Sequence, residues 1–146
     1  MSARILLADD DDIFQRTTAA LLRKNGYGCE CVSDASEAAL ALKNNSYDLL
    51  ISDVNMPGSS DMDLPHLDRP GAQWLPVIIV TSNPSLASAV TSLRKSALDY
   101  LSKPLLEAEF LARVRSAIEK GRILRTLKQS QDDIAQSTER LGALRD

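Results

Sequence analysis

The sequence predicts an α/β fold, a doubly wound parallel sheet with helices on both faces and an extended helix at the C-terminus. Three observations support this prediction. Short continuous apolar runs, typical of strands buried on both faces, alternate with segments of helical periodicity. Capping residues mark the ends of several helical segments. Alternation of strand and helix implies right-handed crossovers between parallel strands.

The first half of the chain predicts two strands and two helices. Asp34 followed by Glu37 resembles a capping box, which indicates that a helix begins there. The pair Asn25-Gly26 is a common ending for the helix before it. The predicted elements are, in order, strand Arg4–Ala8, a helix from about Ile13 to Lys24, strand Tyr27–Val32, and a helix from Ala35 to about Lys43.

The second half predicts three more strands, Asp48–Ser52, Pro76–Val80 and Asp99–Ser102. Asn83-Pro84 is an N-cap followed by proline, so a helix is expected from there to about Lys95. The segment Asp61–Gly71 should hold a helix between the third and fourth strands, but it contains two prolines. Proline inside a helix costs about 3 kcal/mol. We therefore expect this helix to be short, irregular or missing.

A long helical pattern begins after Leu106, with Phe110, Leu111, Val114 and Ile118 expected to face the sheet. Its apolar positions then continue at heptad-like spacing, which favours a coiled coil that forms a homodimer. The alternative is a frayed polar tail, and Gly121 weakens helix continuity at the junction. We predict a first domain over residues 1–122 and a helical extension over residues 123–146. The seam consists of Leu124, Leu127, Ile134 and Leu141, interrupted by Gln131 and Thr138.

Size and composition exclude several classes of protein. The chain has 146 residues, 44% of them hydrophobic, which suits one soluble domain with a sizeable core. A net charge of -3 gives no reason to expect nucleic-acid binding, for which a basic face is the usual sign. Apolar runs are too short to span a membrane, and the N-terminus does not resemble a signal peptide, so we expect a cytoplasmic protein. Cys29 and Cys31 are expected to be small buried side chains.

Polar residues follow the predicted strands at the points where the strands end. Asp9 and Asp10 follow the first strand, Asp53 the third, Thr81 the fourth and Lys103 the fifth. Each alone is compatible with a turn, a cap or a solvated side chain. In an open parallel sheet, however, the carboxyl ends of strands share one edge, where ligands bind. The sequence therefore predicts that these five residues converge.

The chemistry of such a cluster follows from its charge. Carboxylates held close together repel one another, and a divalent cation removes the repulsion. Mg²⁺ suits the site because it prefers hard oxygen ligands and needs only a few carboxylates. Lys103 and the Thr81 hydroxyl could each contact a phosphoryl oxygen. Asp53 is then the expected nucleophile, which would accept a phosphoryl group.

The chain resembles the receiver domains of two-component response regulators over about residues 3 to 122. The matching segments are I-L-L-A-D-D-D, D-L-L-I-S-D-V-N-M-P-G, P-V-I-I-V-T-S and L-D-Y-L-S-K-P-L. This resemblance implies a flavodoxin-like sheet of five strands in the order 2-1-3-4-5. It also implies phosphorylation of Asp53 by a sensor histidine kinase or phosphotransfer protein. The chain would be a signalling domain rather than an enzyme.

The resemblance also implies roles for individual residues. Asp10, Asp53 and the main-chain carbonyl of Asn55 match the metal ligands, with Asp9 acting mostly through water. Thr81 and Lys103 match residues that bind the phosphoryl oxygens, and Tyr100 matches an aromatic switch. Lys103-Pro104 is a candidate for a cis peptide bond.

Two other functions remain open from the sequence. Asp9 and Asp11 have the D-x-D spacing of haloacid-dehalogenase-like phosphatases, in which the first aspartate is the nucleophile. That class needs a further acidic pair and a cap region, and neither is recognisable downstream. The second alternative is a receiver fold that only dimerises and is never phosphorylated. Retention of all five site residues argues against it.

Overall fold

A computed structural model describes residues 3–53, 75–82 and 97–145 of the chain. Five strands in this part of the chain form one parallel sheet in the order β2-β1-β3-β4-β5, which confirms the expected topology. The helices and strands begin and end within a residue or two of their predicted bounds. They are β1 (Arg4–Ala8), α1 (Asp12–Lys24), β2 (Gly28–Val32), α2 (Ala35–Asn44), β3 (Leu49–Asp53), β4 (Val77–Thr81), β5 (Ala97–Ser102) and α4 (Glu107–Arg145).

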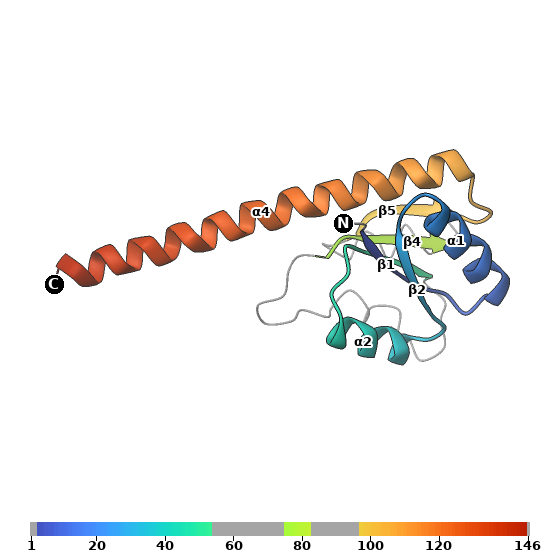
Figure 1. Ribbon diagram of the computed structural model, residues 1–146, viewed down its shortest axis with the longest axis horizontal. Coiled ribbons are helices and arrows are strands. Elements are labelled where there is room, and N and C mark those ends of the chain that lie inside the picture. The colour runs from blue at the N-terminus through green and yellow to red at the C-terminus, as the bar shows by residue number, and fades with distance from the viewer. Residues whose placement is uncertain (1–2, 54–74, 83–96, 146) are drawn as a thin grey trace.

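Helices cover both faces of the sheet, as Figure 1 shows. Alternate residues of a strand point to opposite faces, so β1 contributes Ile5 and Leu7 to one hydrophobic cluster and Leu6 and Ala8 to the other. The first cluster is completed by residues of α1 and α4, and the second by residues of α2. This double burial explains why the strands read as continuous apolar runs.

Aspartate side chains cap the first two helices. Asp11 accepts a hydrogen bond from the backbone N–H of Phe14 at 3.0 Å, and Asp34 accepts one from the N–H of Glu37 at 2.7 Å. Both are N-caps of the expected kind, because a carboxylate satisfies an N–H that has no partner within its helix. Gly26 follows α1 with a φ of 89°, a conformation that favours glycine. The predicted turn at Asn25-Gly26 is therefore confirmed.

One expectation about the cysteines is wrong. Cys29 is buried, but Cys31, two residues along the same strand, is exposed. Their strand, β2, is at the edge of the sheet, and Cys29 is its only buried residue. Burial raises the pKa of the Cys29 thiol to about 12, with the neighbouring Cys31 adding to the shift.

The irregular helix expected over residues 61–71 and the helix expected over residues 83–95 lie outside the described residues.

The long C-terminal helix packs on the sheet with its first turns. Phe110, Val114, Ala117 and Ile118 are buried in the first cluster, with Leu111 packed against it, as predicted. A Cβ atom at Gly121 would lie only 2.9 Å from Cγ of Pro76, so glycine allows the close approach of α4 to the start of β4. The helix then leaves the sheet and continues without interruption to Arg145 (Figure 1).

Beyond this contact, α4 presents apolar side chains to solvent. The predicted seam residues Leu124 and Leu127 are 39% and 55% exposed, and the adjacent Ile123 is 55% exposed. The other predicted seam residues, Ile134 and Leu141, lie outside the described side chains. No helix in the described ranges combines the length and the apolar character that crossing a bilayer requires.

Candidate functional site

The parallel sheet brings four of the predicted site residues to one edge. Asp9 directly follows β1, Asp53 ends β3, Thr81 ends β4 and Lys103 directly follows β5. The register pairs Ala8 with Ser52, Asp53 with Val80, and Thr81 with Ser102. The ends of these neighbouring strands are therefore level, and the predicted convergence is confirmed for these residues.

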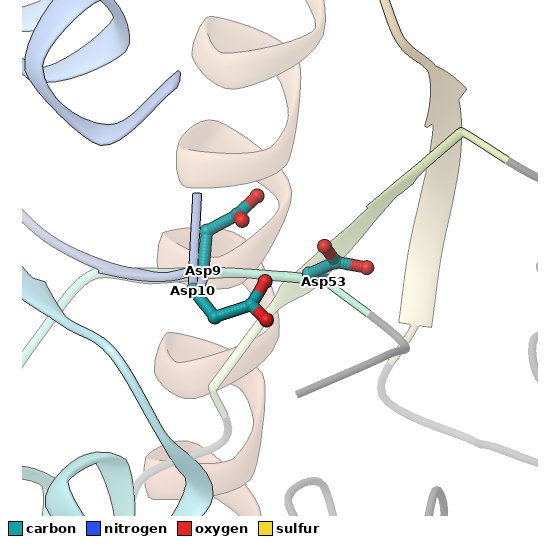
Figure 2. A group of neighbouring side chains, drawn as sticks. All are labelled: Asp9, Asp10 and Asp53. Atoms are coloured by element: carbon teal, nitrogen blue, oxygen red, sulfur yellow. The ribbon is translucent and has the colours of Figure 1, made fainter. Parts of the chain in front are cut away.

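Three carboxylates lie side by side at this edge. Asp9 and Asp10 follow β1 and Asp53 ends β3, as Figure 2 shows. One carboxylate oxygen from each lies within 4.8 Å of the other two. The group ranges from buried Asp9 through half-buried Asp53 to exposed Asp10. Like charges at such separations repel, so the group favours a bound cation.

Lys103 contacts two of these carboxylates. Its Nζ lies 2.7 Å from Oδ2 of Asp9 and 3.3 Å from Oδ2 of Asp53. The backbone N–H of Lys103 donates to the carbonyl of Thr81 at 2.8 Å, which fixes the start of the loop after β5. Burial tends to lower the pKa of Lys103, but the contacts with Asp9 and Asp53 outweigh it and raise that pKa above its ordinary value. The side chain is therefore a cation directed at Asp53.

Asp9 is the most buried member of the group, with an exposed fraction of 0%. Burial raises its pKa, opposed by Lys103 and by the N–H of Asp11, which donates to Oδ1 at 2.9 Å. Oδ2 forms the ion pair with Lys103 at 2.7 Å, and no other described residue donates a hydrogen bond to it. A buried oxygen with spare acceptor capacity, beside two further carboxylates, suits a hard cation that retains some of its water.

Gln15 contributes to this site although the sequence analysis did not identify it. The two N–H groups of its buried Nε2 face three acceptors, the carbonyl of Asp9, the carbonyl of Val32 at 2.7 Å and, more distantly, Oγ of Ser33 at 3.3 Å. It therefore ties the ends of β1 and β2 to α1. A signal was present, since Gln15 is a polar residue on the buried face of α1, which also contains Thr18, Ala19 and Leu22.

The remaining predicted residues have different surroundings. Thr81 is fully buried at the end of β4, whereas Tyr100 on β5 is 41% exposed. The peptide bond between Lys103 and Pro104 is cis, as expected from the resemblance. Asn55, the predicted main-chain ligand, lies outside the described residues.

The geometry disfavours a phosphatase that uses Asp9 and Asp11. Asp9 has no exposed surface and is paired with Lys103, so a substrate could not reach it as a nucleophile. Asp11 accepts the Phe14 N–H as the N-cap of α1. Asp53 is the partly exposed carboxylate that faces Lys103.

Comparison with known proteins also identifies the chain as a receiver domain. The response regulator receiver domain family matches residues 5–115. Response regulator MprA of Mycobacterium ulcerans (strain Agy99) is 34% identical over 137 residues, which cover 94% of this chain and 56% of that protein. The chain thus spans about half the length of the curated relatives it matches.

Two solved structures have the same fold. A putative response regulator from Chloroflexus aurantiacus J-10-fl has a TM-score of 0.74 and 28% identity, covering 82% of this chain and 99% of its own. The receiver domain of sensor histidine kinase PA1611 from Pseudomonas aeruginosa PAO1 has a TM-score of 0.70 and 26% identity, with coverage of 82% and 99%. That structure has a magnesium ion coordinated in its active-site cleft. Sequence, fold and site together show that this chain belongs to the response regulator receiver domain family of two-component systems.

Proposed function

We propose that this domain accepts a phosphoryl group on Asp53 in a Mg²⁺-dependent reaction, with the phosphohistidine of a sensor histidine kinase or phosphotransfer protein as donor. The main support for this proposal is the position of Asp53. Its carboxylate lies beside those of Asp9 and Asp10 and 3.3 Å from the ammonium of Lys103. That arrangement surrounds one partly exposed carboxylate with the groups that a phosphoryl group needs.

The proposed reaction is a simple displacement. An oxygen of Asp53 forms a bond to phosphorus, the P–N bond of the phosphohistidine breaks, and the electron pair leaves on the imidazole. Lys103 offsets the negative charge on the phosphoryl oxygens, and the hydroxyl of Thr81 is available as a further donor. Asp10, Asp53 and the main-chain carbonyl of Asn55 would hold the Mg²⁺, with Asp9 acting through water. When bound, the cation supplies charge neutralisation.

Phosphorylation would change the surface around β5 and α4. The new group adds about -1.5 to -2 charges and three acceptor oxygens beside Thr81 and Lys103, which draws both toward Asp53. Tyr100, now 41% exposed, would turn inward as Thr81 moves. In this role the domain is a switch that regulates a partner or its own dimer rather than a classical enzyme.

We also propose that α4 forms a homodimer through its apolar seam. The seam residues Leu124 and Leu127 are 39% and 55% exposed on a helix that extends beyond the sheet, and the adjacent Ile123 is 55% exposed. Leu127→Glu should convert a dimer into a monomer in sedimentation equilibrium, because it puts a charge into the seam. Thr126→Glu, an exposed neighbour, should leave the dimer intact. A wild-type monomer at high protein concentration would contradict the proposal.

Incubation with acetyl phosphate and Mg²⁺, followed by intact-protein mass spectrometry, tests the phosphoacceptor. We expect one phosphoryl group on the wild type, none on Asp53→Asn, and one on the matched variant Asp12→Asn. Asp12 is exposed and pairs with Arg16, so it is outside the carboxylate group. Turnover of small phosphate esters that is lost in Asp9→Asn would instead indicate a phosphatase. An unmodified wild type would favour a scaffold that is never phosphorylated.

A further inference from the structure

The ammonium of Lys103 contacts an aromatic ring as well as two carboxylates. Its Nζ lies 4.3 Å from the centroid of the Phe14 ring, within the range of a cation–π interaction. Lys103 is largely buried, with 16% of its side chain exposed. The attraction between a cation and a ring is stronger where water is excluded. The contact is therefore suited to restrict where the ammonium lies.

Phe14 is itself fixed by the residues of the site. Asp9 Oδ1 accepts the N–H of Asp11 at 2.9 Å, and Asp11 Oδ1 accepts the N–H of Phe14 at 3.0 Å. The Phe14 ring contacts the ammonium of Lys103, and this ammonium forms the ion pair with Asp9 at 2.7 Å. These four contacts form a closed circuit that joins the end of β1, the first turn of α1 and the residue after β5. Replacing the ring would therefore change the contacts that position the Lys103 ammonium.

The Phe14 ring and Lys103 both line a neighbouring groove. The groove has a volume of about 550 Å³ and is lined mainly by α1 and by the loop that leads into α4. Its lining includes Ile13, Phe14, Leu21, Leu105 and Phe110. Lysine has a long flexible stem, and its ammonium is strongly hydrated. Without the ring, the ammonium of Lys103 would have more room to move into this groove and away from Asp53.

We propose that Phe14 is a positioning residue for phosphoryl acceptance, which acts by holding the Lys103 ammonium beside Asp53. This inference rests on the proposed function of Asp53 and adds to it a residue that acts through Lys103. The alternative is that Phe14 merely packs, since it also contacts the core cluster. The two differ in one respect: packing needs an apolar side chain of similar size, whereas positioning needs an aromatic face.

The test measures the rate of phosphorylation by acetyl phosphate with Mg²⁺ in Phe14→Leu and Phe14→Tyr. We expect Phe14→Leu to be about three- to tenfold slower than the wild type, and Phe14→Tyr to remain within about twofold, because tyrosine keeps the aromatic face. Leu21→Met, in the same groove, is the matched control and should leave the rate unchanged. Urea unfolding of each variant verifies that the domain is folded under the conditions of the assay.

A double-mutant cycle separates positioning from packing. In a Lys103→Met background, Phe14→Leu should have no further effect on the rate, because the ring then has no cation to hold. If Lys103→Met is too unstable for the assay, the difference in phosphorylation rate between Phe14→Leu and Phe14→Tyr distinguishes positioning from packing by itself. Equal rates for those two variants would overturn the role of Phe14 and leave the phosphoacceptor intact. A wild type that gains no phosphoryl group would overturn both.

Discussion

Lys103→Met is expected to lower the free energy of unfolding by about 3 kcal/mol at neutral pH without divalent cations. Lys103 is the cation that contacts Asp9 and Asp53 among the described residues, and Asp9 has no exposed surface. Removing one member of a buried ion pair leaves the other without compensation, which costs more than the pair contributed. Urea unfolding in the presence of a chelator measures the change.

The loss should depend on pH in a defined direction. The pKa of Lys103 is raised in the folded protein, so its contribution is fully present below pH 10.5 and is lost as the pH rises through the folded value. Asp9, whose pKa is raised from 3.8, can take up a proton as the pH falls and no longer needs a counter-charge. The difference between wild type and Lys103→Met should therefore be largest near neutrality and shrink toward both extremes.

Two controls define the cause of the loss. Lys120→Met changes an exposed lysine on α4 and should alter stability by less than about 0.5 kcal/mol. The double variant Asp9→Asn with Lys103→Met should recover most of the lost stability, because it removes the uncompensated charge as well as the cation. A single variant Lys103→Met as stable as the wild type at pH 7 would contradict this account.

The fold could be predicted from the sequence because its strands are buried on both faces. Ile5, Leu6 and Leu7 read as one apolar run, and in the structure they divide between the two hydrophobic clusters. The site could be predicted for a related reason. Parallel strands end at a common edge, so Asp53 and Lys103 had to meet once the strands were correctly assigned.

What the sequence did not predict depends on contacts between side chains of different elements. Gln15 and Phe14 are ordinary residues of an amphipathic helix until the ends of β1, β2 and β5 are placed beside them. The sequence suggested that Gly121 weakens α4, whereas the structure shows that it permits close contact with Pro76. Cys31 was misjudged because an edge strand looks like any other strand in a sequence.

Magnesium is expected to stabilise the wild type, by about 2.7 kcal/mol at a concentration a hundred times its dissociation constant, and Asp10→Asn is expected to remove most of this effect. A cation that binds only the folded state shifts the unfolding equilibrium by mass action. In the proposed site its binding energy would come mainly from the carboxylates of Asp10 and Asp53, of which Asp10 is the exposed one. Thermal or urea unfolding over a series of Mg²⁺ concentrations measures the effect.

Asp10 is the informative position because its side chain is not part of the buried structure. Without metal, Asp10→Asn should be as stable as the wild type or slightly more so, since one of three mutually repelling charges is gone. Asp12→Asn, in the same acidic run, should respond to Mg²⁺ as the wild type does. If Mg²⁺ left the wild-type transition unmoved, or moved that of Asp10→Asn equally, the carboxylates would not form the metal site. Lys103 would then be the counter-charge that the described residues supply to the cluster, and the Mg²⁺ requirement proposed for phosphorylation would have to be abandoned.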